Sequence, residues 1–260
     1  MDQLLFATYS LRDLVTYRQW AEQLGCGLEL HTFVDPAVLA GDVAGMIAAH
    51  RRLLDNFGGA IGFHGAFYDM MSGSLDPSVV ELTRQRYRQN LSVAQALKGE
   101  YVVFHANYMG SFKLINYRSG WHRRQVAFWK SFAIETEDNG LCLLLENMWA
   151  DDPAIVADIL DEIDHPNLRA CLDVSHVVLY STHSVSSWID TLQPWLYCCH
   201  LNNTNGEQDL HWPLGQGIID YDLILDHLRR LPSPPCMTLE MPDWSTISES
   251  LGYFELPARL

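Results

Sequence analysis

Eight short apolar runs alternate with stretches of helical character along the whole of this 260-residue chain. The runs cover residues 4–10, 27–33, 60–67, 101–108, 141–149, 168–176, 195–203 and 236–243. They recur about every 25 to 40 residues, which is the combined length of a strand, a loop and a helix. Eight such repeats predict parallel strands closed into a (β/α)8 TIM barrel, an α/β fold in which residues 1–260 form a single domain.

The segments between the runs carry the start and stop signals of helices. Residues 35–58, 76–99 and 151–163 each begin with aspartate and have apolar side chains at helical spacing, and the first two end in glycine. A doubly wound open sheet is the alternative fold, but it would place a glycine-rich turn after an early strand. The sequence contains neither GxGxxG nor GxxxxGK followed by Ser or Thr, so the closed barrel is favoured.

The net charge indicates which kinds of partner the chain can bind, and the cysteines indicate its cellular compartment. Lys and Arg number 17 against 32 Asp and Glu, a net charge of −15, which argues against a nucleic-acid partner. No run approaches the roughly 18 apolar residues of a membrane span, and the N-terminal residues do not resemble a signal peptide. The six cysteines form no CxxC pair, which predicts buried, reduced thiols in a cytoplasmic protein.

Six consecutive runs, from the third to the eighth, end in or lead to a side chain that can bind a metal. In TIM barrels these strand ends meet at one rim, where catalytic groups lie. A carboxylate buried there is costly without a partner cation. Nitrogen and oxygen donors without cysteine suit zinc, manganese, cobalt or magnesium. The candidate metal ligands are His64, His105, Glu146, Asp173, His176, His200, Asp209, His211 and Glu240.

The motifs around these residues resemble those of the xylose isomerase-like TIM barrel superfamily. They are ENM at Glu146, CLDVSH from Asp173 to His176 and HLNNTNGEQDLHWPLGQGIID from His200, and the resemblance runs from GLELH to TLEMP. It implies a single divalent metal on Glu146, Asp173, His200 and Glu240. It also implies that Glu146 and Glu240 move a proton beside a metal-polarised carbonyl of a sugar or sugar phosphate, as in an isomerase or epimerase.

The same superfamily includes the endonuclease IV family, whose nine zinc ligands all have counterparts in this chain. That resemblance implies an alternative function, a multinuclear zinc phosphoesterase. Departures count against DNA repair, because Asn202 to Asn205 replace a basic residue after the seventh run, and Met148 and Trp149 replace small residues after the fifth. A dehydratase of a cyclic hydroxy acid would use the same proton abstraction as an isomerase. A non-catalytic sugar-binding barrel is the third reading.

Further residues are weaker candidates for contact with the substrate. Glu29, Phe67, Tyr68 and Trp212 are expected to bind substrate, although Glu29 could instead orient a ligand and the aromatic side chains could simply pack. His31 lies on the same strand side as Glu29, and its role is open. A phosphate-binding patch after the fourth run would consist of Lys113, Arg118, Arg123 and Arg124. Histidines expected at the surface are His50, His165, His183 and His227. The sequence sets neither the substrate, nor the number of metals, nor the oligomeric state.

Overall fold

The computed structural model describes residues 3–110 and 115–257, and its strands close into one barrel. The order is β1 to β8 in sequence, all neighbours are parallel, and β1 also pairs with β8. The strands are β1 Leu4–Thr8, β2 Gly27–Leu30, β3 Ile61–His64, β4 Tyr101–His105, β5 Cys142–Glu146, β6 Leu168–Asp173, β7 Leu196–Leu201 and β8 Cys236–Leu239. Each of the eight predicted runs contains one strand, which confirms the TIM barrel.

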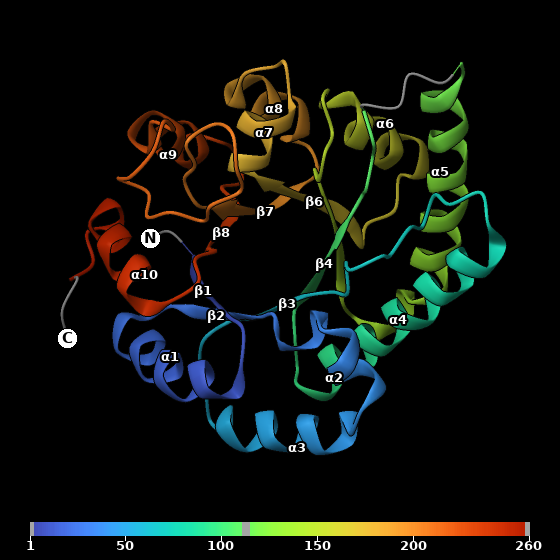
Figure 1. The fold of residues 1–260 in the computed structure, drawn as a ribbon. Helices are drawn as coiled ribbons and strands as arrows, with labels where there is room; N and C mark the ends of the chain where they lie inside the picture. The colour runs from blue at the N-terminus through green and yellow to red at the C-terminus, as the bar shows by residue number, and fades with distance from the viewer. Residues whose placement is uncertain (1–2, 111–114, 258–260) are drawn as a thin grey trace.

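Helices surround the strands on the outside, and both ends of the described chain lie near β1 and α10 (Figure 1). The α-helices are α1 Leu11–Leu24, α2 Pro36–Ala40, α3 Val43–Leu53, α4 Pro77–Ala96, α5 Tyr117–Glu135, α6 Ala154–Ile163, α7 Val174–Tyr180, α8 Val185–Leu192, α9 Tyr221–Arg229 and α10 Trp244–Ser250. Short 3-10 turns are η1 Thr32–Val34, η2 Glu137–Asn139 and η3 Leu251–Phe254. In the described residues, no helix is both long enough and apolar enough to span a membrane.

The single helix expected over residues 35–58 is wrong, because the chain breaks there into α2 and α3. Gly41 ends α2 with φ −94° and ψ −146°, a conformation far from that of a helix, so the helix cannot continue through it. Asp42 then accepts a hydrogen bond from the backbone N–H of Gly45 and starts α3. The expected helices over 76–99 and 151–163 are confirmed as α4 and α6.

Two layers of apolar side chains stabilise the barrel, and they follow from the alternation of residues along each strand. The larger layer includes Phe6 and Leu28 and packs the strands against the helices. The smaller cluster inside the barrel consists of Leu5, Tyr101, Val103, Leu144, Cys171, Cys198 and Cys236. All six cysteines are free, and five are buried, as expected for structural thiols. The interior of the barrel is therefore filled with apolar side chains, and the polar groups lie above them at the rim.

A close approach between β3 and β4 shapes this interior. A Cβ atom added to Gly62 would lie 2.2 Å from Cζ of Tyr101, so only glycine leaves room for that ring. The Tyr101 hydroxyl thereby reaches Glu29 on β2 and donates to its Oε2 over 2.7 Å. A polar group is thus held under the rim, in the middle of the barrel.

Candidate metal centre

The C-terminal ends of β3 to β8 bring six of the predicted metal ligands to one rim. Strand pairing sets His105 opposite Glu146 and Asp173 opposite His200. These residues are at most 7% exposed, and they include His64 at the end of β3 and Glu240 directly after β8. A rim this polar and this buried needs its groups to satisfy one another or a shared ion.

A first group consists of His64, His105 and Glu146. Nε2 of each histidine lies 3.3 Å from Oε2 of Glu146, and the two nitrogens lie 3.2 Å apart. Three donor atoms therefore converge from three neighbouring strands. All of them lie within 4.8 Å of one another, a spacing compatible with one ion between them.

A second group is the set that the resemblance implies for a single metal, namely Glu146, Asp173, His200 and Glu240. Nδ1 of His200 lies 3.1 Å from Oε2 of Glu240 and 3.8 Å from Oε2 of Glu146. Asp173 is fixed by its surroundings, since Oδ1 accepts from Ser175 and from the backbone N–H of His176. Hydrogen bonds of this kind orient a carboxylate toward a metal. Burial nevertheless raises the pKa of Asp173, with His176 partly opposing.

A third group consists of His176, Asp209 and His211. Asp209 accepts from Nε2 of His176 over 3.3 Å, and Nε2 of His211 lies 3.3 Å from its other oxygen. His211 has φ +47° and its Nδ1 lies 2.6 Å from the carbonyl oxygen of Glu240, so the loop after β7 is folded back over the rim. The structure thus brings all nine predicted ligands together.

Two buried nitrogen atoms in this centre make no hydrogen bond, and they test whether an ion fits. Nδ1 of His176 and Nδ1 of His200 are unpartnered, although each lies 3.1 Å from a glutamate oxygen. An unpaired buried polar atom is costly and needs an explanation. A nitrogen and an oxygen that are close but not hydrogen bonded are in the arrangement of two ligands facing a common ion. The donor set therefore fits a divalent metal.

The carboxylates and histidines of the centre shift one another's pKa values. Burial would raise the pKa of Glu146, but His105, His176 and His200 outweigh it and hold that pKa well below the usual range. Burial likewise opposes ionisation of Glu240, yet His200 leads the neighbours that lower its pKa to about 2. The pKa of His211 rises to about 10, because Glu240 and Asp209 outweigh the effect of burial. Ionised carboxylates here are compensated by positive charge, which a divalent ion can also supply.

Glu29 does not face open space, contrary to its expected contact with substrate. Its side chain is fully buried on β2, and its oxygens accept from His31, Tyr101 and Thr238. Nε2 of His200 lies 3.1 Å from Oε1 of the same carboxylate. Because four neighbours occupy its acceptor sites, Glu29 has no capacity left for a sugar hydroxyl.

A cavity of about 390 Å³ opens beside the centre. Phe67 and Tyr68 line it, as expected from the sequence, whereas Trp212 does not. The backbone of Trp212 instead pairs with Asn203 in the loop after β7. The other lining residues are Tyr9, His31, Val34, Leu210, His211, Glu240 and Pro242. His211 and Glu240 thus belong both to the metal centre and to the cavity wall.

The sequence left some groups in this region unassigned. His31 reaches the cavity from the segment after β2, and Tyr9 packs on its ring with 4.9 Å between centroids. Cys171 and Cys198 come within 4.8 Å of His200 from below, where periodicity alone predicted only packing. One signal in the sequence pointed to His31: it is two positions after Glu29, so alternation along an extended chain puts both side chains on the same side.

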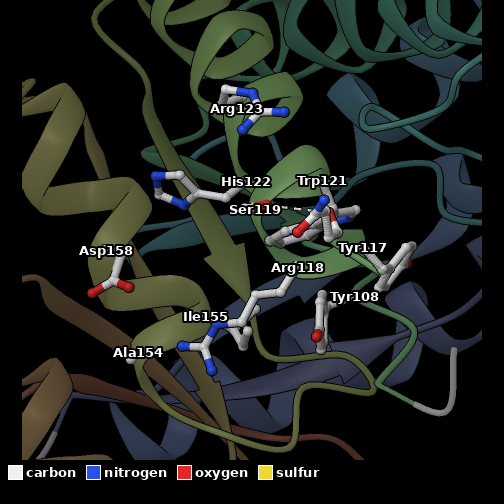
Figure 2. A pocket seen from close by; sticks show the side chains of 11 residues that line it. Tyr108, Tyr117, Arg118, Ser119, Trp121, His122, Arg123, Ala154, Ile155 and Asp158 are labelled. Carbon is white, nitrogen blue, oxygen red and sulfur yellow. Dashed lines mark hydrogen bonds between the residues drawn. The ribbon is translucent and has the colours of Figure 1, made fainter. Parts of the chain in front are cut away.

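The predicted phosphate patch is divided and lies elsewhere. Arg118 and Arg123 line a cavity of about 610 Å³ between α5 and α6, where Figure 2 shows the Arg118 side chain next to Ile155. Arg118 is paired with Asp152 over 2.8 Å, and Arg124 donates to the carbonyl oxygen of Gly73. Lys113 lies outside the described residues. These arginines do not line the cavity beside the metal centre.

The expected surface position of His50 is wrong. Its side chain is fully buried on α3, Nδ1 donates to the carbonyl oxygen of Met46, and Nε2 lies 3.2 Å from Oγ1 of Thr32. The helical context resembled that of a surface residue because the partner on η1 is distant in sequence. His165 and His227 are half-buried, and His183 is exposed.

The chain belongs to the xylose isomerase-like TIM barrel family, whose model matches residues 19–255. The TTHB071 protein of Thermus thermophilus, from a ZnCl2 soak, is similar with a TM-score of 0.78 and 26% identity, over 98% of this chain and 97% of that one. A D-tagatose 3-epimerase-like protein has a TM-score of 0.75 and 21% identity, over 98% and 95%. The 3-dehydroshikimate dehydratase of Bacillus anthracis is 29% identical over 111 residues, 35% of this chain and 39% of that protein.

Proposed function

We propose that this protein is a divalent-metal-dependent sugar isomerase or epimerase. One observation carries the proposal: Glu240 lies 3.1 Å from the unpartnered Nδ1 of His200 and also lines the cavity beside the centre. The same carboxylate therefore faces the position of an ion and the space for a substrate. Family membership and the likeness to an epimerase-like fold agree with this chemistry.

Glu146, Asp173, His200 and Glu240 would hold the catalytic metal. When bound, a divalent ion such as manganese, cobalt or magnesium supplies the Lewis acidity that polarises a sugar carbonyl and stabilises an enediolate. Zinc is the expected ion if the centre holds more than one metal. Asn202 supports the site by donating to Oδ2 of Asp173 over 3.1 Å.

Glu146 and Glu240 are the proposed acid and base. They come from β5 and β8, so they approach the centre from different directions, and both reach Nδ1 of His200. Both carboxyl groups have lowered pKa values and are ionised at neutral pH, which allows either to accept a proton from carbon. The carboxylate that accepts the proton becomes the acid, and its return of that proton to the neighbouring carbon gives an isomer. An epimer requires the other carboxyl group to carry a proton beforehand and to deliver it to the opposite face of the same carbon, while the first group keeps the proton that it removed.

The cavity favours a sugar-sized substrate. Phe67 and Tyr68 offer aromatic surfaces against which the C–H face of a sugar ring packs. A dehydratase of a cyclic hydroxy acid would begin with the same proton abstraction. Any phosphate group on the substrate would have to find another partner than Arg118, which is already paired with Asp152.

A second candidate is a multinuclear zinc phosphoesterase, and the third ligand group favours it. This group brings three further candidate ligands together: each oxygen of Asp209 lies 3.3 Å from an Nε2 atom, one of His176 and one of His211. Ions at several positions would clamp the oxygens of a phosphodiester. This reading predicts two or three bound ions, whereas the isomerase needs one.

Solvent deuterium exchange separates the two. Metal-loaded protein is incubated in D2O with a panel of ketoses, aldoses and sugar phosphates, and deuterium at the carbon beside the carbonyl is followed by NMR. We expect incorporation, reduced about 100-fold or more in Glu146→Gln and Glu240→Gln. Glu162→Gln is the matched control, since Glu162 pairs with His122 at the surface of α6. Cleavage of a nitrophenyl phosphodiester without exchange into any sugar would instead establish the phosphoesterase.

A further inference from the structure

Glu29 is surrounded by four hydrogen-bonding groups in the interior of the barrel. Its Oε1 accepts from Nε2 of His31 over 2.8 Å, and Nε2 of His200 lies 3.1 Å from the same atom. Its Oε2 accepts from Tyr101 over 2.7 Å and from Thr238 over 2.9 Å. The side chain is fully buried, so these contacts replace all of its water.

An ionised carboxylate can only accept hydrogen bonds, so a histidine nitrogen that bonds to it must carry the proton. Nε2 of His31, Nε2 of His200 and the hydroxyl groups of Tyr101 and Thr238 all lie within hydrogen-bonding distance of Glu29, and a carboxylate that only accepts satisfies all four. Each imidazole must therefore place a proton on Nε2 to make its contact. A neutral ring with its proton on Nε2 has a free lone pair on Nδ1.

The two Nδ1 atoms face different partners. On His200 this atom lies 3.1 Å from Glu240 and makes no hydrogen bond, at the position of a metal ligand. On His31 it lies 3.9 Å from Oε1 of Glu240, beyond hydrogen-bonding distance, on a ring that lines the cavity.

We propose that Glu29 is a positioning residue that fixes the Nε2–H tautomer of two histidines at once. His200 thereby offers Nδ1 to the metal, and His31 offers Nδ1 as a hydrogen-bond acceptor to a hydroxyl group of the substrate. The second part rests on the proposed function, because it assumes a hydroxylated substrate in this cavity. The first part concerns only the metal centre and can be tested without turnover.

The surroundings of Glu29 support a dedicated role. Tyr101 crosses the barrel from β4 to reach it, and the absence of a side chain at Gly62 makes that path possible. Thr238 approaches from β8 on the other side. TIM barrel interiors are ordinarily filled by branched apolar side chains. A carboxylate in this layer is held there by donors from four different parts of the barrel.

Long-range ¹⁵N NMR of the histidine rings tests the proposal on zinc-loaded protein at neutral pH. We expect His31 to be protonated on Nε2 only, and His200 to carry its proton on Nε2 with Nδ1 bound to metal. A His31 ring protonated on Nδ1 in the unaltered protein would overturn the proposal, whatever the variants do.

The informative variant is Glu29→Gln, with Tyr101→Phe as its matched control. A glutamine has one accepting oxygen and one donating amide, so it cannot accept from both sides as the carboxylate does. We expect a changed tautomer in at least one ring and zinc affinity reduced about 10- to 100-fold. Tyr101→Phe removes a donor but touches neither ring, so both tautomers should persist. Unchanged rings and unchanged zinc affinity in Glu29→Gln would overturn the positioning role.

Turnover tests the second part separately. On any sugar that the protein converts, His31→Gln should raise KM about 2- to 10-fold, the effect of one lost hydrogen bond, with a smaller change in kcat. An unchanged KM would reject the acceptor role of His31. If no sugar is converted while the tautomers are as stated, the proposed function fails and the role of Glu29 in the metal centre stands.

Discussion

Nδ1 of His200 lies 3.1 Å from Oε2 of Glu240, and the two atoms are not hydrogen bonded. Because the histidine is fully buried, its nitrogen cannot find water instead. The side chains come from the ends of the adjacent strands β7 and β8. A shared divalent ion accounts for both the closeness and the missing hydrogen bond.

Removing the metal should therefore cost stability. An ion that binds the folded chain alone stabilises it by about 2.7 kcal/mol at a concentration 100 times its Kd. For a chain of this length that corresponds to roughly 5 to 10 °C in Tm. Differential scanning calorimetry before and after chelation, and after return of zinc or manganese, measures the difference. A Tm that changes neither on chelation nor on return of the metal would contradict a metal centre.

Gly62→Ala should destabilise the barrel through Tyr101. The new methyl group would lie 2.2 Å from Cζ of that ring, and overpacking of this kind costs about 1 to 3 kcal/mol. Gly58→Ala is the control, since a Cβ there meets nothing within 4 Å. Urea unfolding of the two variants measures the difference. Equal stability of both would show that Tyr101 can move aside freely.

His50 should make stability depend on pH. Burial lowers its pKa in the folded state, with the Met46 carbonyl partly opposing, whereas the unfolded value is about 6.5. Folding therefore favours the neutral ring, and its contribution is present above about pH 6.5 and is lost as the pH falls through the lowered value.

Unfolding free energies at pH 8 and pH 5.5 check this sign. The unaltered protein should lose more stability between the two than His50→Gln does. His183→Gln, which alters an exposed side chain, should behave like the unaltered protein. A larger loss in His50→Gln would reverse the assignment.

Periodicity predicted the strands because each is short, apolar and bounded by a helix. It also placed candidate metal ligands such as His64 and Glu146 at strand ends, and the barrel brings these side chains together. The break at Gly41 escaped this reasoning, since apolar spacing continues through it. Local pattern describes one element at a time, and a break depends on backbone conformation.

Contacts between residues that are far apart in the sequence were the other feature that the sequence could not predict. Nothing in the segment around Glu29 reveals that Tyr101, 72 positions away, takes up one of its oxygens. Likewise the ion pair of Arg118 on α5 with Asp152, which lies just before α6, uses a side chain that was expected to bind phosphate. The candidate metal ligands could be predicted from the sequence, whereas the contacts that support them required the fold.

Elemental metal analysis of protein purified without chelators tests the central claim most directly. The account predicts one tightly bound divalent ion per chain, lost in Asp173→Asn and retained in His211→Gln, because Asp173 belongs to the second group and His211 only to the third. Protein without any bound ion, or with two or three ions of which none is lost in Asp173→Asn, would contradict it.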